Sequence, residues 1–255
     1  MKHLYLLLSL FILAIAQGQT TQDTIYVWKA GQLVIKQSIK PADIDSITFK
    51  RPVVNILPQV TICTQVWTIK NLDVTAYSDG TVIPQVTDPT AWANLTTGAW
   101  CYYNNDAANN ATYGKLYNWY AAAGIYDAAS LANPTLRKNL APTGWHVPTD
   151  AERTTLTTCL GGETVAGGKM KETGTAHWLS PNTDATNSSG FTALPGGYRS
   201  GGGPFYSYGT GGYWWSSSET ETAYAWVYGL DYNYGNVFTG GGNMTGGLSV
   251  RCLKD

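Results

Sequence analysis

The chain has 255 residues and a formal net charge of −1, and only 13% of its residues are charged. It has no basic run of the kind that binds nucleic acid or anionic lipid, so we expect neither partner. Its aromatic residues are mostly Trp (10) and Tyr (17), and 28 residues are Gly. Tyr and Trp are frequent at recognition surfaces, although a Trp-rich core explains many of them equally well.

The first segment has the features of a secretory signal peptide. A positive charge at Lys2 precedes an apolar run over residues 4–15, and small residues follow at 16–18. The run is shorter than the roughly 20 apolar residues of a membrane-spanning helix. We therefore expect residues 1–18 to be cleaved, the mature protein to be periplasmic, secreted or at the cell surface, and no direct membrane insertion afterwards. The first cysteine is Cys63, which argues against a lipid-anchored mature terminus.

A short β region and the start of a linker are predicted over residues 19–52. Apolar and polar residues alternate in 25–28 and in 33–35, with a Gly-containing turn between them, which indicates a β-hairpin. Residues 44–49 are expected to add a third strand. A unit of this size buries little apolar surface alone, so we expect an adaptor or strand donor. The two prolines within 51–58 favour a linker.

The rest of the chain, residues 57–255, has the length of one large domain. Its first half predicts two strands, at 60–63 and 66–69, and then a loop-rich stretch from 77 to 110. Apolar side chains at helical spacing predict a helix over 114–125.

The strongest helix signal follows Pro148. Thr149 is a favourable N-cap, and Glu152 stands three residues later, where it completes a capping box. Leucines recur at 156 and 160, and a glycine pair ends the pattern. The segment therefore predicts a scaffold helix.

From about residue 190 the sequence changes to short strands and Gly-rich loops. Strands are predicted at 213–216, 225–228 and 248–252. About two helices in the first half and a loop-rich antiparallel β second half predict an α+β domain.

The cysteines are Cys63, Cys101, Cys159 and Cys252. They lie far apart and form no Cys-x-x-Cys pair, which argues against a metal site. An even number in an exported protein permits disulfides in three pairings, and four buried thiols are the alternative.

Four segments resemble a known family. They are Gly-Trp-His-Val-Pro-Thr-Asp-Ala-Glu (144–152), Ala-Leu-Pro-Gly-Gly-Tyr-Arg (193–199), Tyr-Trp-Trp-Ser-Ser-Ser-Glu (213–219) and Ser-Val-Arg-Cys (249–252). In this order they resemble the Fibrobacter succinogenes major paralogous domain, common in exported bacterial proteins, and the resemblance runs roughly from Val60 to Asp255. The first segment is also similar to the formylglycine-generating sulfatase-modifying family, and this similarity implies a C-type-lectin-like fold.

Arg153 departs from both families, which usually carry Trp at this position. If Arg153 lies on the packed face of its helix, the guanidinium needs a partner or access to water, because an unpaired buried charge is costly.

No residue pattern predicts catalysis, so we expect a protein that is not an enzyme and needs no cofactor or metal. His146 and His177 are the histidines after the leader, and neither has metal-site or Cys-His spacing. The formylglycine-generating enzymes use a close cysteine pair near the C-terminus, where this chain has only Cys252. Glu219 and Glu221 are a weak hydrolase signal that a solvated strand end explains better.

Calcium-dependent sugar binding, which some C-type lectins perform, has little support in the sequence. The Glu-Pro-Asn and Trp-Asn-Asp motifs of such lectins are missing. Asp231 and Asn233 could supply oxygen ligands, but calcium prefers 6–8 oxygens.

The stretch from Ser200 to Gly247 predicts a binding surface for a protein or glycan. It is rich in Tyr, Gly, Ser, Asn and Thr, which antibody loops use for adaptable recognition, although ordinary β-loops share this composition. The candidate contacts are Tyr206, Tyr208, Tyr228, Asp231, Tyr232, Asn233, Tyr234, Phe238 and Asn243. Trp214 and Trp226 are expected to be scaffold.

Two further interpretations remain. Some proteins of this fold are diversified by retroelements that vary exposed codons upstream of a motif like Ser-Val-Arg-Cys, and this sequence fits that pattern. Alternatively, the chain is a structural or adhesion component of the cell envelope without a specific ligand, joined to an assembly through residues 19–52.

Overall fold

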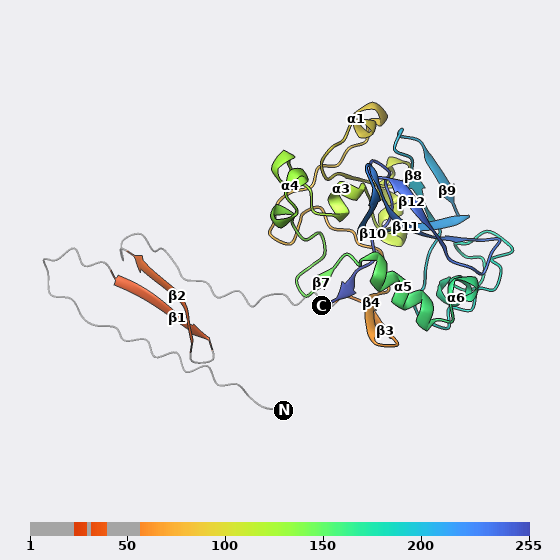
Figure 1. Cartoon of the computed structure of the whole chain (residues 1–255), viewed down its shortest axis with the longest axis horizontal. Helices are drawn as coiled ribbons and strands as arrows, with labels where there is room; N and C mark the ends of the chain where they lie inside the picture. Colours follow the sequence, from red (N-terminus) through yellow and green to blue (C-terminus); the bar gives the residue numbers. More distant parts are fainter. Residues whose placement is uncertain (1–22, 30–31, 40–56) are drawn as a thin grey trace, which may run out of the picture. The chain divides into compact units, whose positions relative to one another are not determined.

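The computed structural model describes residues 23–29, 32–39 and 57–255, which belong to two compact units, 1–55 and 56–255 (Figure 1). In the first unit, β1 (Asp23–Lys29) and β2 (Gln32–Ile39) pair antiparallel. The predicted hairpin is therefore confirmed. The predicted signal peptide, the third strand at 44–49 and most of the linker lie outside the described residues.

The second unit is a mixed α+β domain with a curled, mostly antiparallel sheet (Figure 1). Its largest sheet has the order β12-β11-β10-β8-β9, and only the β10–β8 pairing is parallel. These strands are β8 (Gly196–Arg199), β9 (Phe205–Tyr208), β10 (Gly211–Glu221), β11 (Tyr224–Asp231) and β12 (Phe238–Asn243). All five come from the C-terminal quarter of the chain.

Two smaller sheets complete the domain. The four-stranded one has the order β3-β4-β13-β7, so strands from both ends of the domain lie together. Its strands are β3 (Gln59–Ile62), β4 (Gln65–Thr68), β7 (Trp145–His146) and β13 (Leu253–Lys254). A two-stranded sheet pairs β5 (Trp100–Cys101) with β6 (Leu116–Tyr117). The predicted strands at 60–63 and 66–69 correspond to β3 and β4 within one residue.

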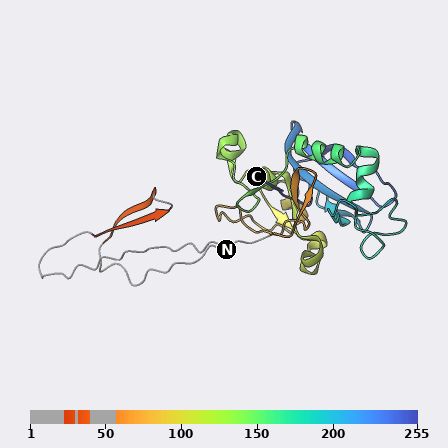
Figure 2. The same cartoon turned by 90° about the horizontal axis from the view of Figure 1, so that it is seen from below.

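Helix α5 (Asp150–Cys159) confirms the helix predicted after Pro148. Thr149 Oγ1 accepts a hydrogen bond from the Glu152 backbone N–H, and the Glu152 carboxylate accepts one from the Thr149 N–H, so the capping box is complete. The apolar residues at 156 and 160 are buried. Figure 2 shows this helix and α6 (Glu163–Met170) as green and teal ribbons on one side of the blue strands of the large sheet.

The predicted helix over 114–125 is largely wrong. Residues 116–117 form β6, and only Trp119–Ala122 is helical (α3). The Tyr117 backbone exchanges hydrogen bonds with Leu248, at 2.8 and 2.9 Å, and the Asn118 side chain caps the short helix at the Ala121 N–H. Tertiary pairing therefore overrides the helical spacing in this segment.

The loop-rich stretch and its surroundings hold only short helical turns. These are α1 (Pro89–Ala93), η2 (Tyr103–Asn105), η3 (Ala107–Asn109), α2 (Asn110–Tyr113), α4 (Ala128–Ala132) and η4 (Pro134–Leu136). The predicted strand at 248–252 is reduced to isolated bridges at Leu248 and Ser249, which precede β13. No helix of the described residues is long and apolar enough to cross a membrane.

Tryptophan dominates the interior of the domain. Six Trp side chains are almost completely buried, namely Trp67, Trp92, Trp119, Trp178, Trp214 and Trp215. Two main apolar cores lie on opposite faces of the large sheet, because Trp214 and Trp215 are neighbours on β10 and belong to different cores. The expectation that Trp214 is scaffold is confirmed, and Trp226 is half-buried.

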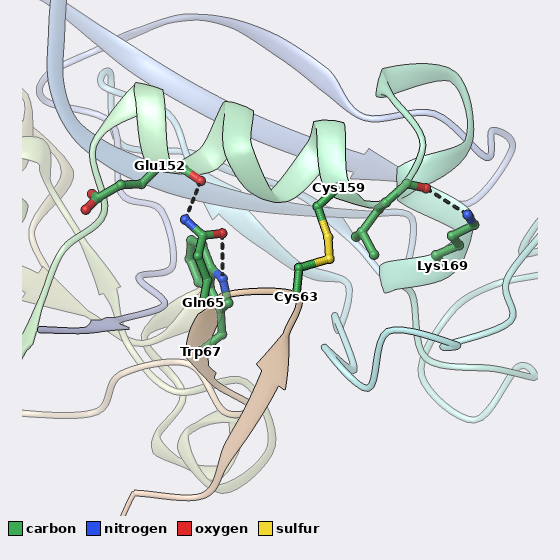
Figure 3. The surroundings of a disulfide bond; sticks show 7 residues. Cys63, Gln65, Trp67, Glu152, Cys159 and Lys169 are labelled. Carbon is green, nitrogen blue, oxygen red and sulfur yellow. Dashed lines mark hydrogen bonds between the residues drawn. A yellow bond between two sulfur atoms is a disulfide. The ribbon is translucent and has the colours of Figure 1, made fainter.

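One disulfide joins Cys63, in the turn between β3 and β4, to Cys159 at the end of α5, with 6.6 Å between the Cα atoms (Figure 3). Next to it, Gln65 Nε2 donates to the Glu152 carbonyl at 3.0 Å, which also ties this turn to the helix. Cys101 and Cys252 are free and buried, and burial raises the pKa of each thiol to about 12. The chain therefore combines one bridge with two buried thiols.

Arg153 lies on the packed face of α5 and is only 1% exposed. Its guanidinium stands over the rings of Trp67 and Tyr228, 4.9 and 5.6 Å from their centroids. Nη2 donates to the Trp215 carbonyl at 3.4 Å, while Nε and Nη1 have no hydrogen-bond partner among the described residues. Burial lowers the pKa of Arg153 to about 10. Position 153 therefore holds an incompletely paired cation in the core.

Candidate functional site

A cavity of about 400 Å³ lies over one face of the large sheet. Its apolar lining consists of Tyr198 on β8, Tyr213 and Trp215 on β10, Val227 on β11, Phe238 on β12 and Leu248. Side chains two residues apart on a strand share a face, so Tyr213 and Trp215 line the cavity while Trp214 packs into the core behind the sheet. We call this surface the cavity face.

Glycines shape the floor of the cavity. Gly229 on β11 and Gly240 and Gly242 on β12 line it. No heavy atom lies within 4 Å of the position that a Cβ would take at Gly240, so the cavity is open there. At Gly229 the same position is 3.1 Å from the Tyr213 ring. A larger residue at 229 would therefore displace Tyr213, and one at 240 would fill the cavity.

Aromatic rings continue beyond the cavity along the sheet. The Tyr198 and Tyr213 rings meet edge to face with centroids 5.0 Å apart, and Tyr198 is 5.7 Å from Tyr206 on β9. At the other side, Phe238 makes an edge contact with Tyr234 at 5.7 Å. Burial and the neighbouring tyrosines raise the pKa of Tyr198, so its hydroxyl is neutral at physiological pH.

The cavity has no free charge. Arg199 is its one charged lining residue, and it is fully buried. Its guanidinium donates to three backbone carbonyls, at Val86, Thr87 and Gly203, over distances of 2.7–2.9 Å. The polar residues that also line it are Ser200, Thr239 and Asn243, although the side chain of Thr239, which pairs with Tyr228, is on the opposite face of the sheet. The site is thus suited to a neutral, partly apolar ligand.

A buried lysine fixes the turn between β11 and β12. Lys171 Nζ donates to the carbonyls of Thr183, Asp231 and Tyr234 at 2.8–2.9 Å. Burial lowers the pKa of Lys171, against the opposing effect of two nearby aspartates. The Asp231 carboxylate accepts from the Asn233 N–H at 2.8 Å, which closes the turn further. This turn therefore presents Tyr234 to Phe238 from a rigid base.

The structure brings some of the predicted contacts together and separates others. Phe238 and Asn243 line the cavity. Tyr206 and Tyr234 extend it, through Tyr198 and Phe238 respectively. The remaining turn residues, Asp231, Tyr232 and Asn233, do not line the cavity. Tyr232 packs against the core on the opposite face of the sheet.

Two predicted contacts serve the scaffold instead. Tyr228 is only 6% exposed, and its hydroxyl donates to the Asp150 carboxylate at 2.8 Å, so it belongs to the core under α5. Strand alternation places it on the face opposite Val227. Tyr208 is exposed, but it packs against Tyr103 and Tyr113 at 5.0 and 5.2 Å, away from the cavity lining.

The two histidines and Glu219 form contacts outside the cavity. His146 lies between the carboxylates of Glu152 and Asp255, at 3.0 and 2.7 Å, and His177 contacts Glu172 at 2.8 Å. Glu219 pairs with Arg137 at the surface, at 3.1 Å. Among the described residues, no group of three or more His, Cys, Asp or Glu side chains is placed to hold a metal ion.

The sequence prediction missed Tyr198, Tyr213 and Trp215. All three lie in the segments 193–199 and 213–219 that carry the family resemblance, outside the predicted contacts. The alternation on β10, where Tyr213 and Trp215 share the face opposite Trp214, is a sequence signal for these two residues. Tyr198 on β8 has no such signal.

The family model described as the Fibrobacter succinogenes major domain matches residues 60–254. No curated protein and no solved structure matches the chain.

Proposed function

The chain belongs to the Fibrobacter succinogenes major domain family, and on this premise we propose that it is an exported or surface binding module that presents its cavity face to a protein or glycan. The observation that carries the proposal is the cavity of about 400 Å³ lined by aromatic side chains from β8, β10 and β12. Pockets with an apolar, aromatic lining and a few polar groups are typical of ligand sites.

Export is supported by two independent features. The first 18 residues have the pattern of a cleavable leader. The disulfide between Cys63 and Cys159 fits an oxidising compartment outside the cytoplasm. A binding role rather than catalysis is supported by the neutral cavity lining, which holds no candidate acid, base or nucleophile pair.

The proposal includes a C-type-lectin-like scaffold and diversification by a retroelement. The α+β arrangement with a loop-rich C-terminal half agrees with such a scaffold. Asn233, Tyr234, Phe238 and Asn243 are exposed, while the motif at 249–252 is buried. A near-repeat of the coding segment beside a reverse transcriptase gene would support diversification, and a genome without either would refute it.

The test is a binding screen of the chain against arrayed glycans and envelope proteins, beside Gly240→Leu. The leucine side chain would fill the open space over β12 without meeting another atom at its Cβ, so the fold should be kept while the cavity is blocked. We expect a specific signal that Gly240→Leu abolishes, with unchanged thermal unfolding. A complete lack of binding would instead favour a structural component of the envelope, an alternative that the separate N-terminal unit supports.

A further inference from the structure

The cavity is one part of an aromatic row that crosses the whole five-stranded sheet. Tyr206 pairs with Tyr198 across β9 and β8. Gly197 and Gly212 pair across β8 and β10, so the next residues, Tyr198 and Tyr213, are neighbours. On the far side, Tyr213 is opposite Gly229 and Gly229 is opposite Phe238. The row therefore runs Tyr206, Tyr198, Tyr213, whose ring covers Gly229, and Phe238.

The row runs perpendicular to the strands. Its four inter-strand steps of about 4.8 Å give a length of about 19 Å. This length suits a chain of several flat units better than one small molecule. Both ends of the row are open, because Tyr206 and Phe238 are 48% and 43% exposed. A chain could thus continue past either edge of the sheet.

The chemistry of the row narrows the ligand. The absence of a free charge in the lining disfavours nucleic acids and acidic polymers, which need cationic partners. Aromatic faces stack on flat apolar surfaces, and Ser200 and Asn243 can hydrogen-bond to hydroxyl groups at the margin. Asn243 Oδ1 accepts from Thr245, and its Nδ2 has no partner among the described residues, so this amide is free to donate. A sugar ring offers both an apolar C–H face and a rim of hydroxyls.

A peptide that adds as a strand would use this sheet differently. It would lie along the edge of β12 and bind through backbone groups, parallel to the strands. Such a peptide would not need side chains on β8 and β9, nor the open space over Gly240. Because the aromatic row runs across the strands, it favours a polymer whose rings stack on the aromatic side chains. It does not favour a peptide that pairs with the edge strand through its backbone.

We propose that the cavity face binds an uncharged polysaccharide, whose sugar rings stack along Tyr206, Tyr198, Tyr213 and Phe238 beside the open space over Gly240. The inference rests on the proposed binding function and names its ligand class. Gly229 lets the Tyr213 ring lie over β11 toward Phe238, because a side chain at 229 would collide with that ring.

The experiment is calorimetric titration of the full chain with neutral hexasaccharides (cellohexaose, xylohexaose and mannohexaose) and with hexagalacturonate as the charged counterpart. We expect at least one neutral hexasaccharide to bind and hexagalacturonate not to bind. Tyr206→Ala and Phe238→Ala should each weaken binding about tenfold, the order of magnitude expected for the loss of one aromatic contact. Gly240→Leu should abolish binding.

Tyr224→Ala is the matched control. Tyr224 is 40% exposed on the same sheet, but it is three residues from Val227 on β11 and therefore faces the other way. Its replacement should leave the affinity unchanged. Thermal unfolding of every variant is measured first, and Tyr206→Ala remains informative if a more buried variant unfolds, because its side chain is largely exposed.

The possible failures are distinguishable. In one failure, no neutral hexasaccharide binds at millimolar concentration, but hexagalacturonate or an arrayed protein binds and Gly240→Leu abolishes that binding. This result would keep the proposed function and overturn the neutral-sugar inference. Hexasaccharide binding that survives Gly240→Leu and Tyr206→Ala would place the sugar elsewhere and also overturn it. No binding of any probe would overturn both.

Discussion

Three arginines are buried in this domain, and they differ in how their guanidinium groups are satisfied. Arg251 donates from Nε to Asn71 Oδ1 and from its two terminal nitrogens to the carbonyls of Thr68, Phe191 and Thr192, at 2.6–2.9 Å. Arg199 is similarly enclosed by carbonyls. Arg153 has a single long hydrogen bond and two unpaired nitrogens. The cost of burial is therefore offset well at 251 and poorly at 153.

The stability of the domain should respond differently to the replacement of Arg153 and of Arg251 by Met. Arg153→Met removes an incompletely paired buried charge, so the free energy of unfolding should stay the same or rise by up to about 2 kcal/mol. Arg251→Met leaves several buried acceptors unsatisfied and should lower it by about 3 kcal/mol or more. Urea denaturation of both variants measures the difference. An equal loss in both would mean that the stacking of Arg153 on Trp67 and Tyr228 outweighs its missing hydrogen bonds.

At the scale of single residues, the sequence predicted exposure only where local chemistry decides it. The turn residues Asn233 and Tyr234 are exposed, as their composition suggested. Tyr228 and Phe238 look alike in sequence, yet the first is buried under α5 and the second lines the cavity. That difference depends on which face of a strand is covered by a helix, and the covering helix is about 70 residues earlier in the chain.

Between elements, the disulfide connects the first hairpin of the domain to the end of α5, across 96 residues of sequence (Figure 3). A long closed loop restricts the unfolded chain strongly, and native disulfides typically contribute about 2–4 kcal/mol. The double substitution Cys63→Ala and Cys159→Ala should lower the unfolding free energy by this amount. The variant should also be insensitive to reductant, whereas the parent protein should be destabilised by it.

Thiol titration checks the pairing separately. The folded chain should show no reactive thiol, because Cys101 and Cys252 are buried with pKa values raised to about 12. Denaturation without reductant should expose two thiols, and reduction should expose all four. Four thiols without reductant would contradict the bridge.

The elements that sequence patterns predicted well are those with local causes. The capping box and the glycine pair define α5 because both act within a few residues of the helix ends. Helix α6 was not predicted, since Gly167 and Gly168 lower its helical propensity. The same glycines let the helix approach the backbone at Asn236 and Asp184 closely, a tertiary reason that the local pattern does not contain. The helix prediction for residues 114–125 failed for the same kind of reason, because Tyr117 in this segment pairs with Leu248.

For the whole molecule, the question is whether the N-terminal unit contributes to the stability and binding of the large domain. All three buried cores, the disulfide and the cavity lie within residues 57–255. A two-stranded hairpin such as β1–β2 is at best marginally stable alone, so we expect it to need a partner of its own. If the chain is a structural component, this partner joins it to an assembly and is essential to its role. If the chain is a binder, the large domain should bind its ligand without this partner.

A chain beginning at residue 57 separates these interpretations. We expect it to unfold within about 2–4 °C of the longer chain that begins at residue 19, the shift that about 1 kcal/mol produces in a domain of this size. Consider any ligand whose binding to the longer chain is abolished by Gly240→Leu. The chain that begins at residue 57 should bind this ligand with unchanged affinity, because no residue of the cavity face precedes Tyr198. A much lower melting temperature would show that the first unit packs on the second. Unchanged stability with lost affinity would mean that the hairpin completes the site, and the binding module would then comprise both units.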